Sequence, residues 1–257
     1  MFGQDKYQSI FGLIGKKIHY SFSKNFFLNK FKKESINNCY YVIYDIPDIK
    51  QVDSIFKNPY IKGCNVTIPY KKSIIPYLTK INSIAKKIGS VNVIKINKYE
   101  KIGYNTDYIG FEGSFIKNIN QILYSKNTLK ALILGTGGVS KSISYVLKKW
   151  KIKYQYISRK KQKGMLIYED INKNLLKEYR IIINCTPLGT YPNINSFPPL
   201  PYQYISDQHY FYDLVYNPNK TLFLRKGEKN GATIKNGLEM LYIQAEESWK
   251  IWNNNNL

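Results

Sequence analysis

The stretch 131-ALILGTGGVS-140 decides the fold class of this chain. Residues 131–134 form a short apolar run of the kind that makes a buried parallel strand. The run breaks into the glycine turn 135-GTGG-138, and apolar residues at helical spacing resume over 140–150. Such a turn is an anion site, because its glycines let the backbone approach a pyrophosphate and the first amides of the helix point at it. The stretch therefore predicts a dinucleotide-binding unit.

A basic segment follows at the position that distinguishes between the two nicotinamide cofactors. The next expected strand, 154–157, is followed by Ser158, Arg159 and Lys160, with further lysines at 161 and 163. In NAD-binding units an acidic residue about 20 positions after the glycines binds the ribose 2′-hydroxyl. A guanidinium there suits a 2′-phosphate, so these residues favour NADP. The spacing is G-x-G-G and not the full fingerprint, so an ordinary strand-to-helix turn beside a solvated basic loop is the alternative for this segment alone.

Composition excludes several classes of protein. The 257 residues suffice for one large domain or two modest ones. Cys39, Cys64 and Cys185 are odd in number and far apart, which predicts neither a disulfide framework nor a metal site. The N-terminus lacks a signal-peptide pattern, and no apolar run approaches the ~20 residues that span a bilayer. We therefore expect a cytoplasmic protein that has no metal and no membrane partner.

The net charge of +22 makes a basic nucleic-acid-binding protein the alternative from another functional class. However, the lysines are scattered over the whole chain, and no nucleic-acid motif accompanies them. The richness in Lys, Asn, Ile and Tyr is also what an AT-biased coding sequence produces. We expect most of the charge to be solvated surface and expect no nucleic-acid partner. A basic surface still helps to capture a small anionic substrate.

Strand-like and helix-like segments alternate along the chain, which predicts an α/β fold with mostly parallel sheets. We expect two domains, the first formed by residues 1–107 and 237–257 and the second, of Rossmann type, by residues 108–236. The C-terminal helix is expected to return to the first domain. The expected strands are 9–14, 39–44, 63–68, 91–96, 131–134, 154–157, 181–184, 211–214 and 232–234. The expected helices are 24–33, 49–56, 81–88, a segment after 107, 140–150, 221–230 and 238–252.

Polar clusters in the first domain follow expected strands, where side chains face the ligand edge of an open parallel sheet. They are 21-SFS-23, 65-NVTIPYK-71 and 105-NTD-107, with Asn92 between the last two. Lys71, paired with a carboxylate such as Asp107, can donate and recover a proton in carbonyl reduction. The neutral hydroxyls and amides suit a polyhydroxylated ligand. Taken singly, each of these residues is more readily explained as a helix cap, a turn residue or a solvated lysine.

Together these segments resemble the shikimate dehydrogenase family over nearly the full length, in the family's order and spacing. The resemblance implies the reversible NADP-dependent reduction of 3-dehydroshikimate to shikimate in chorismate and aromatic amino-acid biosynthesis. It also implies a small-molecule substrate and a monomer or homodimer of two-domain subunits. The resembling segments are 12-GLIG-15, 21-SFS-23, 63-GCNVTIPYK-71, 89-GSVNVI-94, 103-GYNTD-107, 135-GTGG-138, 184-NCTPLGTYP-192, 213-DLVYNP-218 and 236-NGLEML-241 with Gln244.

The resemblance also implies roles for individual residues. The family's paired catalytic residues fall on Lys71 and Asp107. Its substrate-binding positions fall on Ser21, Ser23, Asn65, Thr67, Asn92, Tyr216 and Gln244. Its NADP positions fall on Gly135, Thr136, Gly137, Gly138, Ser158, Arg159, Lys160, Thr186, Leu214 and Gly237.

The chain departs from the family's usual residues without losing a group that the reaction needs. A quinate/shikimate dehydrogenase with broader substrate or NAD use is the alternative within the same superfamily, but Ser21, Thr67 and Arg159 favour the strict shikimate and NADP form. His19 lies one place away from the family's usual histidine and receives no catalytic role, and His209, in a polar loop, is expected at the surface. The departures are Lys17 for proline, Tyr20 for histidine, Lys24 for proline, Ser158 for asparagine, Lys160 for threonine and Ser83 for a carboxylate.

Overall fold

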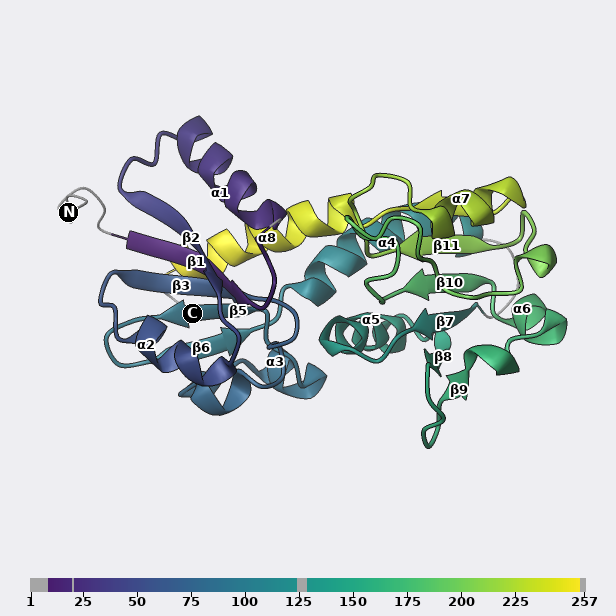
Figure 1. Ribbon diagram of the computed structural model, residues 1–257, viewed down its shortest axis with the longest axis horizontal. Helices are drawn as coiled ribbons and strands as arrows, with labels where there is room; N and C mark the ends of the chain where they lie inside the picture. Colours follow the sequence, from purple (N-terminus) through teal and green to yellow (C-terminus); the bar gives the residue numbers. More distant parts are fainter. Residues whose placement is uncertain (1–8, 20, 124–128, 255–257) are drawn as a thin grey trace. The chain divides into compact units, whose positions relative to one another are not determined.

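The chain folds into two α/β units, each built around one six-stranded sheet (Figure 1). The computed structural model describes residues 9–19, 21–123 and 129–254. Unit 1 contains residues 1–106 and 245–257, and unit 2 contains residues 107–244. The last helix is therefore divided, with its end belonging to unit 1. This is the two-domain α/β fold that the sequence predicted, with the C-terminal helix returning to the first domain.

Unit 1 contains a mixed sheet in the order β2-β1-β3-β5-β6-β4. Its first three strands are parallel, as expected, whereas β5 runs antiparallel to both β3 and β6. The strands β4 and β6 were not predicted. The elements of this unit are β1 (Ser9–Gly15), α1 (Phe22–Lys33), β2 (Cys39–Asp45), η1 (Ile49–Gln51), α2 (Val52–Phe56), β3 (Ile61–Val66), η2 (Ile75–Tyr77), β4 (Lys80–Ile81), α3 (Ser83–Ile88), β5 (Val93–Ile96), β6 (Lys101–Tyr104) and the end of α8 (Leu238–Asn253).

The sheet of unit 1 is packed on both faces, with α1 and the end of α8 on one face and α2 and α3 on the other (Figure 1). Trp252, near the end of α8, stacks on Phe11 of β1 with ring centroids 4.7 Å apart. Its indole Nε1 donates to the carbonyl oxygen of Ile94 on β5 at 3.0 Å. These contacts explain why the C-terminal residues belong to the first unit.

Gly63 on β3 provides a test of this packing, because a Cβ atom there would lie 2.2 Å from Nε1 of Trp252. The indole is buried and hydrogen-bonded, so it cannot move aside without losing contacts. We expect Gly63→Ala to lower the free energy of unfolding by roughly 1–3 kcal/mol, measured by denaturant titration. Gly137→Ala is the control, because a Cβ there meets nothing within 4 Å. Equal stability of the two variants would contradict the described packing of Trp252.

Unit 2 contains an all-parallel sheet in the order β12-β11-β10-β7-β8-β9. The chain starts in the middle with β7, runs outward to β9, and returns to β10 on the other side, which is the Rossmann strand order. The elements are α4 (Asp107–Leu123), β7 (Lys130–Leu134), α5 (Gly138–Lys149), β8 (Lys153–Ser158), β9 (Leu166–Ile167), η3 (Tyr168–Asp170), α6 (Lys173–Glu178), β10 (Ile181–Asn184), η4 (Tyr202–Tyr204), β11 (Tyr210–Asp213), α7 (Leu222–Lys229), β12 (Thr233–Lys235) and the first turns of α8.

Two apolar layers hold helices against the sheet of unit 2. One layer packs α4 and α5 on one face, and the other packs α6 and α7 on the opposite face. Strand order reverses between β7 and β10, and dinucleotides bind outside the carboxyl ends of the strands at such a switch point. The glycine turn that follows β7 lies at this point.

Candidate active site

One edge of the sheet in unit 1 collects most of the predicted substrate-binding residues. The carboxyl ends of β1, β3 and β6 share this edge, because those strands run in the same direction. The antiparallel strand β5 begins there, so Asn92 lies at the same edge as Thr67, which follows β3. Ser21 and Ser23 follow β1 across a short loop. The topology therefore brings together side chains that are more than 70 positions apart in the sequence.

Asp45 holds the loop between β1 and the two serines. Its carboxylate accepts from the backbone amides of Lys17 at 2.8 Å and Ile18 at 3.0 Å, and lies 3.0 Å from Nε2 of His19. Burial of Asp45 raises its pKa, but these three partners outweigh burial and lower the pKa overall. Lys17 has a φ of 57°, which the proline common at this position in the family could not adopt. Tyr20 lies outside the described residues.

The two serines begin helix α1, and Thr67 lies beside the loop that leads to them. Ser21 is the N-cap of the helix, and its Oγ accepts from the backbone amide of Ser23 at 3.3 Å. A Cβ on Gly15, at the end of β1, would lie 2.6 Å from Cγ2 of Thr67. Only a glycine at this position lets Thr67 approach so closely. Both serines and Thr67 are half-buried.

Asn92 and Asn65 are held by residues to which the sequence assigned no role. Asn92 is 2% exposed, its Oδ1 accepts from the amide of Thr106 at 2.7 Å, and its Nδ2 donates to Oγ1 of Thr106 at 3.0 Å. Asn65 is 5% exposed and bonds to Tyr41 and Ser248. Thr106 lies inside the cluster 105-NTD-107 but was given no role there, and Tyr41 and Ser248 lie in none of the quoted segments.

The two predicted catalytic residues differ in their settings. Lys71 is half-buried, and its carbonyl oxygen accepts from the amide of Val91 at 2.8 Å, which places its backbone beside the segment that carries Asn92. Asp107 is 4% exposed and is the first residue of α4. It directly follows Thr106 in the chain.

In unit 2 the glycine turn has the conformation expected of an anion site. Gly135 has a φ of 99°, in the left-handed region that favours glycine, and its amide donates to the carbonyl oxygen of Ile157 at 2.9 Å. Gly137 is the N-cap of α5 without a side-chain cap, and the space where a Cβ would stand is open to 4 Å. Thr136 stands between these glycines, and Gly138 begins the helix. The residues present thus fit the pyrophosphate of a dinucleotide.

The basic segment at the end of β8 lies on the same edge as the glycine turn, because β7 and β8 are parallel neighbours. Ser158 is buried, and its Oγ accepts from the amide of Lys160 and from Nε2 of Gln162, both at 3.3 Å. These bonds shape the loop, and the side chains of Arg159 and Lys160 are exposed. An exposed guanidinium and ammonium at this edge fit a ribose 2′-phosphate.

The remaining predicted cofactor residues follow β10, β11 and β12 at the same edge. Oδ1 of Asn184 accepts from the amide and the hydroxyl of Thr186, at 3.0 and 2.6 Å. A Cβ on Gly237 would lie 2.2 Å from the carbonyl oxygen of Leu214, so the backbone requires glycine there. Of the predicted substrate-binding residues in this unit, Tyr216 and Gln244 are half-buried.

Asp213, at the end of β11, supports this edge and is fully buried. Its carboxylate accepts from Nδ2 of Asn184 at 3.0 Å, the amide of Val215 at 3.0 Å and the hydroxyl of Thr221 at 2.5 Å. Burial raises the pKa of Asp213 to about 7, although these three bonds oppose the shift. The sequence placed this residue in a resembling segment but gave it no role.

The raised pKa predicts a specific dependence of stability on pH. The unfolded carboxyl titrates near 3.9, so between pH ~4 and ~7 the folded state binds the proton that the unfolded state has lost. The contribution of Asp213 to stability therefore falls as the pH rises through this range, by on the order of 4 kcal/mol. We expect Asp213→Asn to gain stability relative to the wild type as the pH rises from 4 to 8, in denaturant titrations. A difference that is constant with pH, or that grows in favour of the wild type, would contradict the assignment.

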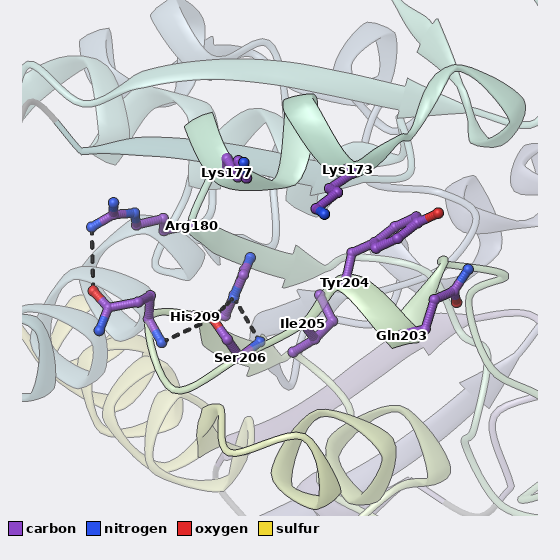
Figure 2. Close-up of a pocket in the computed structure, with 9 residues that line it drawn as sticks. Lys173, Lys177, Arg180, Gln203, Tyr204, Ile205, Ser206 and His209 are labelled. Carbon is purple, nitrogen blue, oxygen red and sulfur yellow. Dashed lines mark hydrogen bonds between the residues drawn. The ribbon is translucent and has the colours of Figure 1, made fainter.

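His209 was expected at the surface, and that expectation is wrong. The residue is 5% exposed, and its Nδ1 accepts from the amide of Ser206 at 3.1 Å (Figure 2). Its Nε2 lies 3.1 Å from the carbonyl oxygen of Leu176 in α6. With Nδ1 as acceptor, Nε2 carries the proton and donates. Burial lowers the pKa of His209 more than these bonds raise it. The ring joins α6 to the loop before β11. The sequence did not indicate this role, because the neighbours of His209 in the chain are polar.

The pocket beside His209 is not the cofactor site. It has a volume of about 670 Å³, and its lining residues are drawn in Figure 2. It lies where β10 and β11 begin, opposite the edge that carries the glycine turn. The pocket is lined by Lys173, Lys177, Arg180, Gln203, Tyr204, Ile205, Ser206, Gln208 and His209.

The chain is similar to known proteins over most of its length. A family model described as the shikimate dehydrogenase substrate-binding domain matches residues 13–94, which include the end of β1 and all of β3. A protein of Clostridium botulinum (strain Hall) named shikimate dehydrogenase (NADP(+)) is 39% identical over 252 residues, covering 94% of this chain and 95% of the relative. This chain belongs to the shikimate dehydrogenase family.

Solved structures show the same relationship. A shikimate dehydrogenase from Peptoclostridium difficile is 37% identical, with a TM-score of 0.81 over 97% of this chain and 93% of that one. A shikimate dehydrogenase crystallised in complex with NADP+ is 31% identical, with a TM-score of 0.81 over 96% of this chain and 90% of that one.

No helix in the described ranges has the length and apolar character needed to cross a membrane. Among the same residues, no three His, Cys, Asp or Glu side chains are grouped so as to hold a metal ion.

Proposed function

We propose that this chain catalyses the reversible NADPH-dependent reduction of 3-dehydroshikimate to shikimate, a step of chorismate and aromatic amino-acid biosynthesis. The observation that carries the proposal is 39% identity over 94% of the chain to a relative named shikimate dehydrogenase (NADP(+)). The polar edge of unit 1 and the glycine turn of unit 2 supply groups suited to a hydroxylated carboxylate and to a dinucleotide.

The proposed roles follow from the chemistry of each group. Bound NADPH supplies the hydride, and negative charge then grows on the substrate oxygen. The Lys71 ammonium stabilises that charge and delivers the proton, and Asp107 orients the ammonium and binds a substrate hydroxyl. Ser21, Ser23 and Thr67 bind the carboxylate of the substrate.

The other predicted positions complete the two binding sites. In the substrate site, the amides of Asn92 and Gln244 and the phenol of Tyr216 bind ring hydroxyls. Asn65, whose amide is bonded to Tyr41 and Ser248, supports the site from the interior of unit 1. In the cofactor site, Arg159 and Lys160 bind the 2′-phosphate beside Ser158. The glycine turn with Thr136 binds the pyrophosphate, and Thr186, Leu214 and Gly237 line the rest of the cofactor site.

One spectrophotometric comparison tests this function against its alternative within the superfamily. The purified chain is assayed with shikimate or quinate, each with NADP+ or NAD+. We expect kcat/KM to be highest for shikimate with NADP+. It should be at least about tenfold lower when quinate replaces shikimate or when NAD+ replaces NADP+. A preference for quinate or for NAD+ would identify a quinate/shikimate dehydrogenase of broader use.

We further propose that the enzyme works in the cytoplasm as a monomer or homodimer, with no nucleic-acid partner. The sequence supports the last point, since no nucleic-acid-binding motif accompanies its basic residues.

A further inference from the structure

A series of buried hydrogen bonds begins at Ser23, one of the predicted substrate-binding residues. Burial raises the pKa of Tyr41, and a side-chain hydrogen bond with Ser23 opposes that shift. The Tyr41 hydroxyl donates to Oδ1 of Asn65 at 2.8 Å. Nδ2 of Asn65 donates to Oγ of Ser248 at 3.0 Å. The series thus reaches α8 from the start of α1 within unit 1.

The series continues from Ser248 to Asn92, the third predicted substrate-binding residue in it after Ser23 and Asn65. Oγ of Ser248 lies 3.4 Å from Oγ1 of Thr106. Oγ1 of Thr106 accepts from Nδ2 of Asn92 at 3.0 Å, and the Thr106 amide donates to Oδ1 of Asn92 at 2.7 Å. This pair of bonds with Thr106 fixes which way the Asn92 amide points. Ser248 therefore stands between the half of the series that reaches Ser23 and the half that reaches Asn92.

The members of the series that follow Ser23 are fully or almost fully buried. Their exposed fractions are 0% for Tyr41, Thr106 and Ser248, 2% for Asn92 and 5% for Asn65. A buried donor or acceptor that loses its partner cannot exchange it for bulk water, so the loss of one group disturbs its neighbours. Removing the Ser248 hydroxyl takes a partner at once from Asn65 and from Thr106.

We propose that Ser248 is a positioning residue of the substrate site, which orients Asn92 through Thr106 and couples it to Ser23 through Asn65 and Tyr41. The proposal rests on the proposed function, because it takes Asn92 and Ser23 as groups that bind the substrate. Ser248 itself is fully buried and acts through the residues that it holds.

Steady-state kinetics of Ser248→Ala test the proposal. We expect the KM for shikimate to rise about fivefold, the effect of one misplaced neutral hydrogen bond, while the KM for NADP+ stays within about twofold. A purely structural role would lower stability without this separation of the two constants. Ser248→Cys, which keeps the volume but bonds weakly, should behave as Ser248→Ala does.

Ser114→Ala is the matched control, because Ser114 in α4 is also fully buried and accepts from a buried tyrosine, Tyr212, at 3.0 Å. We expect Ser114→Ala and Ser248→Ala to lose similar amounts of stability, and only the second to raise the KM for shikimate. An unchanged KM in Ser248→Ala, or equal KM changes in the two variants, would overturn the proposal.

Tyr41→Phe keeps the test decisive if Ser248→Ala does not fold. It removes only the hydroxyl and preserves the stacking of the ring on Phe27, at a centroid distance of 4.5 Å. We expect it to raise the KM for shikimate as well. Where both variants fold, the double variant should raise that KM by less than the product of the two single effects. An unchanged KM in Tyr41→Phe overturns the coupling to Ser23. A wild type without shikimate-dependent activity would instead refute the proposed function, so the two failures are distinguishable.

Discussion

Replacing Lys71 with alanine is expected to lower kcat for shikimate oxidation by about a hundredfold or more, the usual contribution of a general acid–base group. The ammonium supplies both a proton and a positive charge where the oxyanion develops, so its loss acts on the transition state. Shikimate binding should change much less, because the serines, Thr67 and the asparagines remain. The measurement is steady-state kinetics at saturating NADP+, with shikimate binding followed separately by calorimetry.

The neighbouring residue Lys72 provides the control for Lys71. Lys72 is exposed and Lys71 half-buried, so Lys72→Ala removes the same charge one position away without touching the proposed chemistry. Adding Asp107→Asn to Lys71→Ala should lower the rate far less than the product of the single losses, because residues that act as a unit are not additive. If Lys71→Ala raises only the KM at unchanged kcat, Lys71 is a binding residue and the proton comes from another group.

Replacing Arg159 with alanine is expected to weaken NADP+ binding by about tenfold to a hundredfold while leaving NAD+ binding almost unchanged. A charge-assisted contact with a phosphate contributes roughly 1.5–3 kcal/mol, and only NADP+ carries the 2′-phosphate. Arg159 is exposed at the end of β8, where Ser158 shapes the loop, so its removal should not disturb the sheet. The dissociation constants of both cofactors measure the effect.

Arg225→Ala is the matched control for Arg159→Ala, since it removes one exposed guanidinium from α7 in the same unit. It lowers the net charge equally, and we expect it to leave the preference for NADP+ intact. If both variants weaken NADP+ binding equally, the effect belongs to the overall charge of +22. If Arg159→Ala weakens both cofactors equally, Arg159 supports the loop instead of the phosphate.

Long apolar and periodic segments were predictable from the sequence, because their pattern repeats the geometry of the element. The strand over 181–184 and the helix from 238 are observed as predicted, the helix ending one residue later. The glycine turn was placed correctly for the same reason, since a strand must end and a helix begin around it.

The elements that were not predicted are short, and contacts with neighbouring elements stabilise them. Strands β4 and β9 have two residues each and form only by pairing with β6 and β8. Helix α6 is short and largely polar, with one buried residue. No local pattern in the sequence distinguishes such segments from loops.

Supporting residues of the candidate site were the least predictable part. In the sequence, Ser248 cannot be distinguished from a serine on the solvated face of a helix. Its partners are 142 and 183 positions away in the sequence. His209 has polar neighbours yet fills a buried place under α6. Their roles depend on contacts between distant segments, which composition and spacing do not encode.

The rate of NADPH formation by the purified chain, with shikimate and NADP+ together, tests the central claim most directly. The account predicts formation that requires both compounds, proceeds normally in Lys72→Ala, and is about a hundredfold slower or more in Lys71→Ala. No NADPH formation by the wild type, or an equal rate in Lys71→Ala, would contradict it.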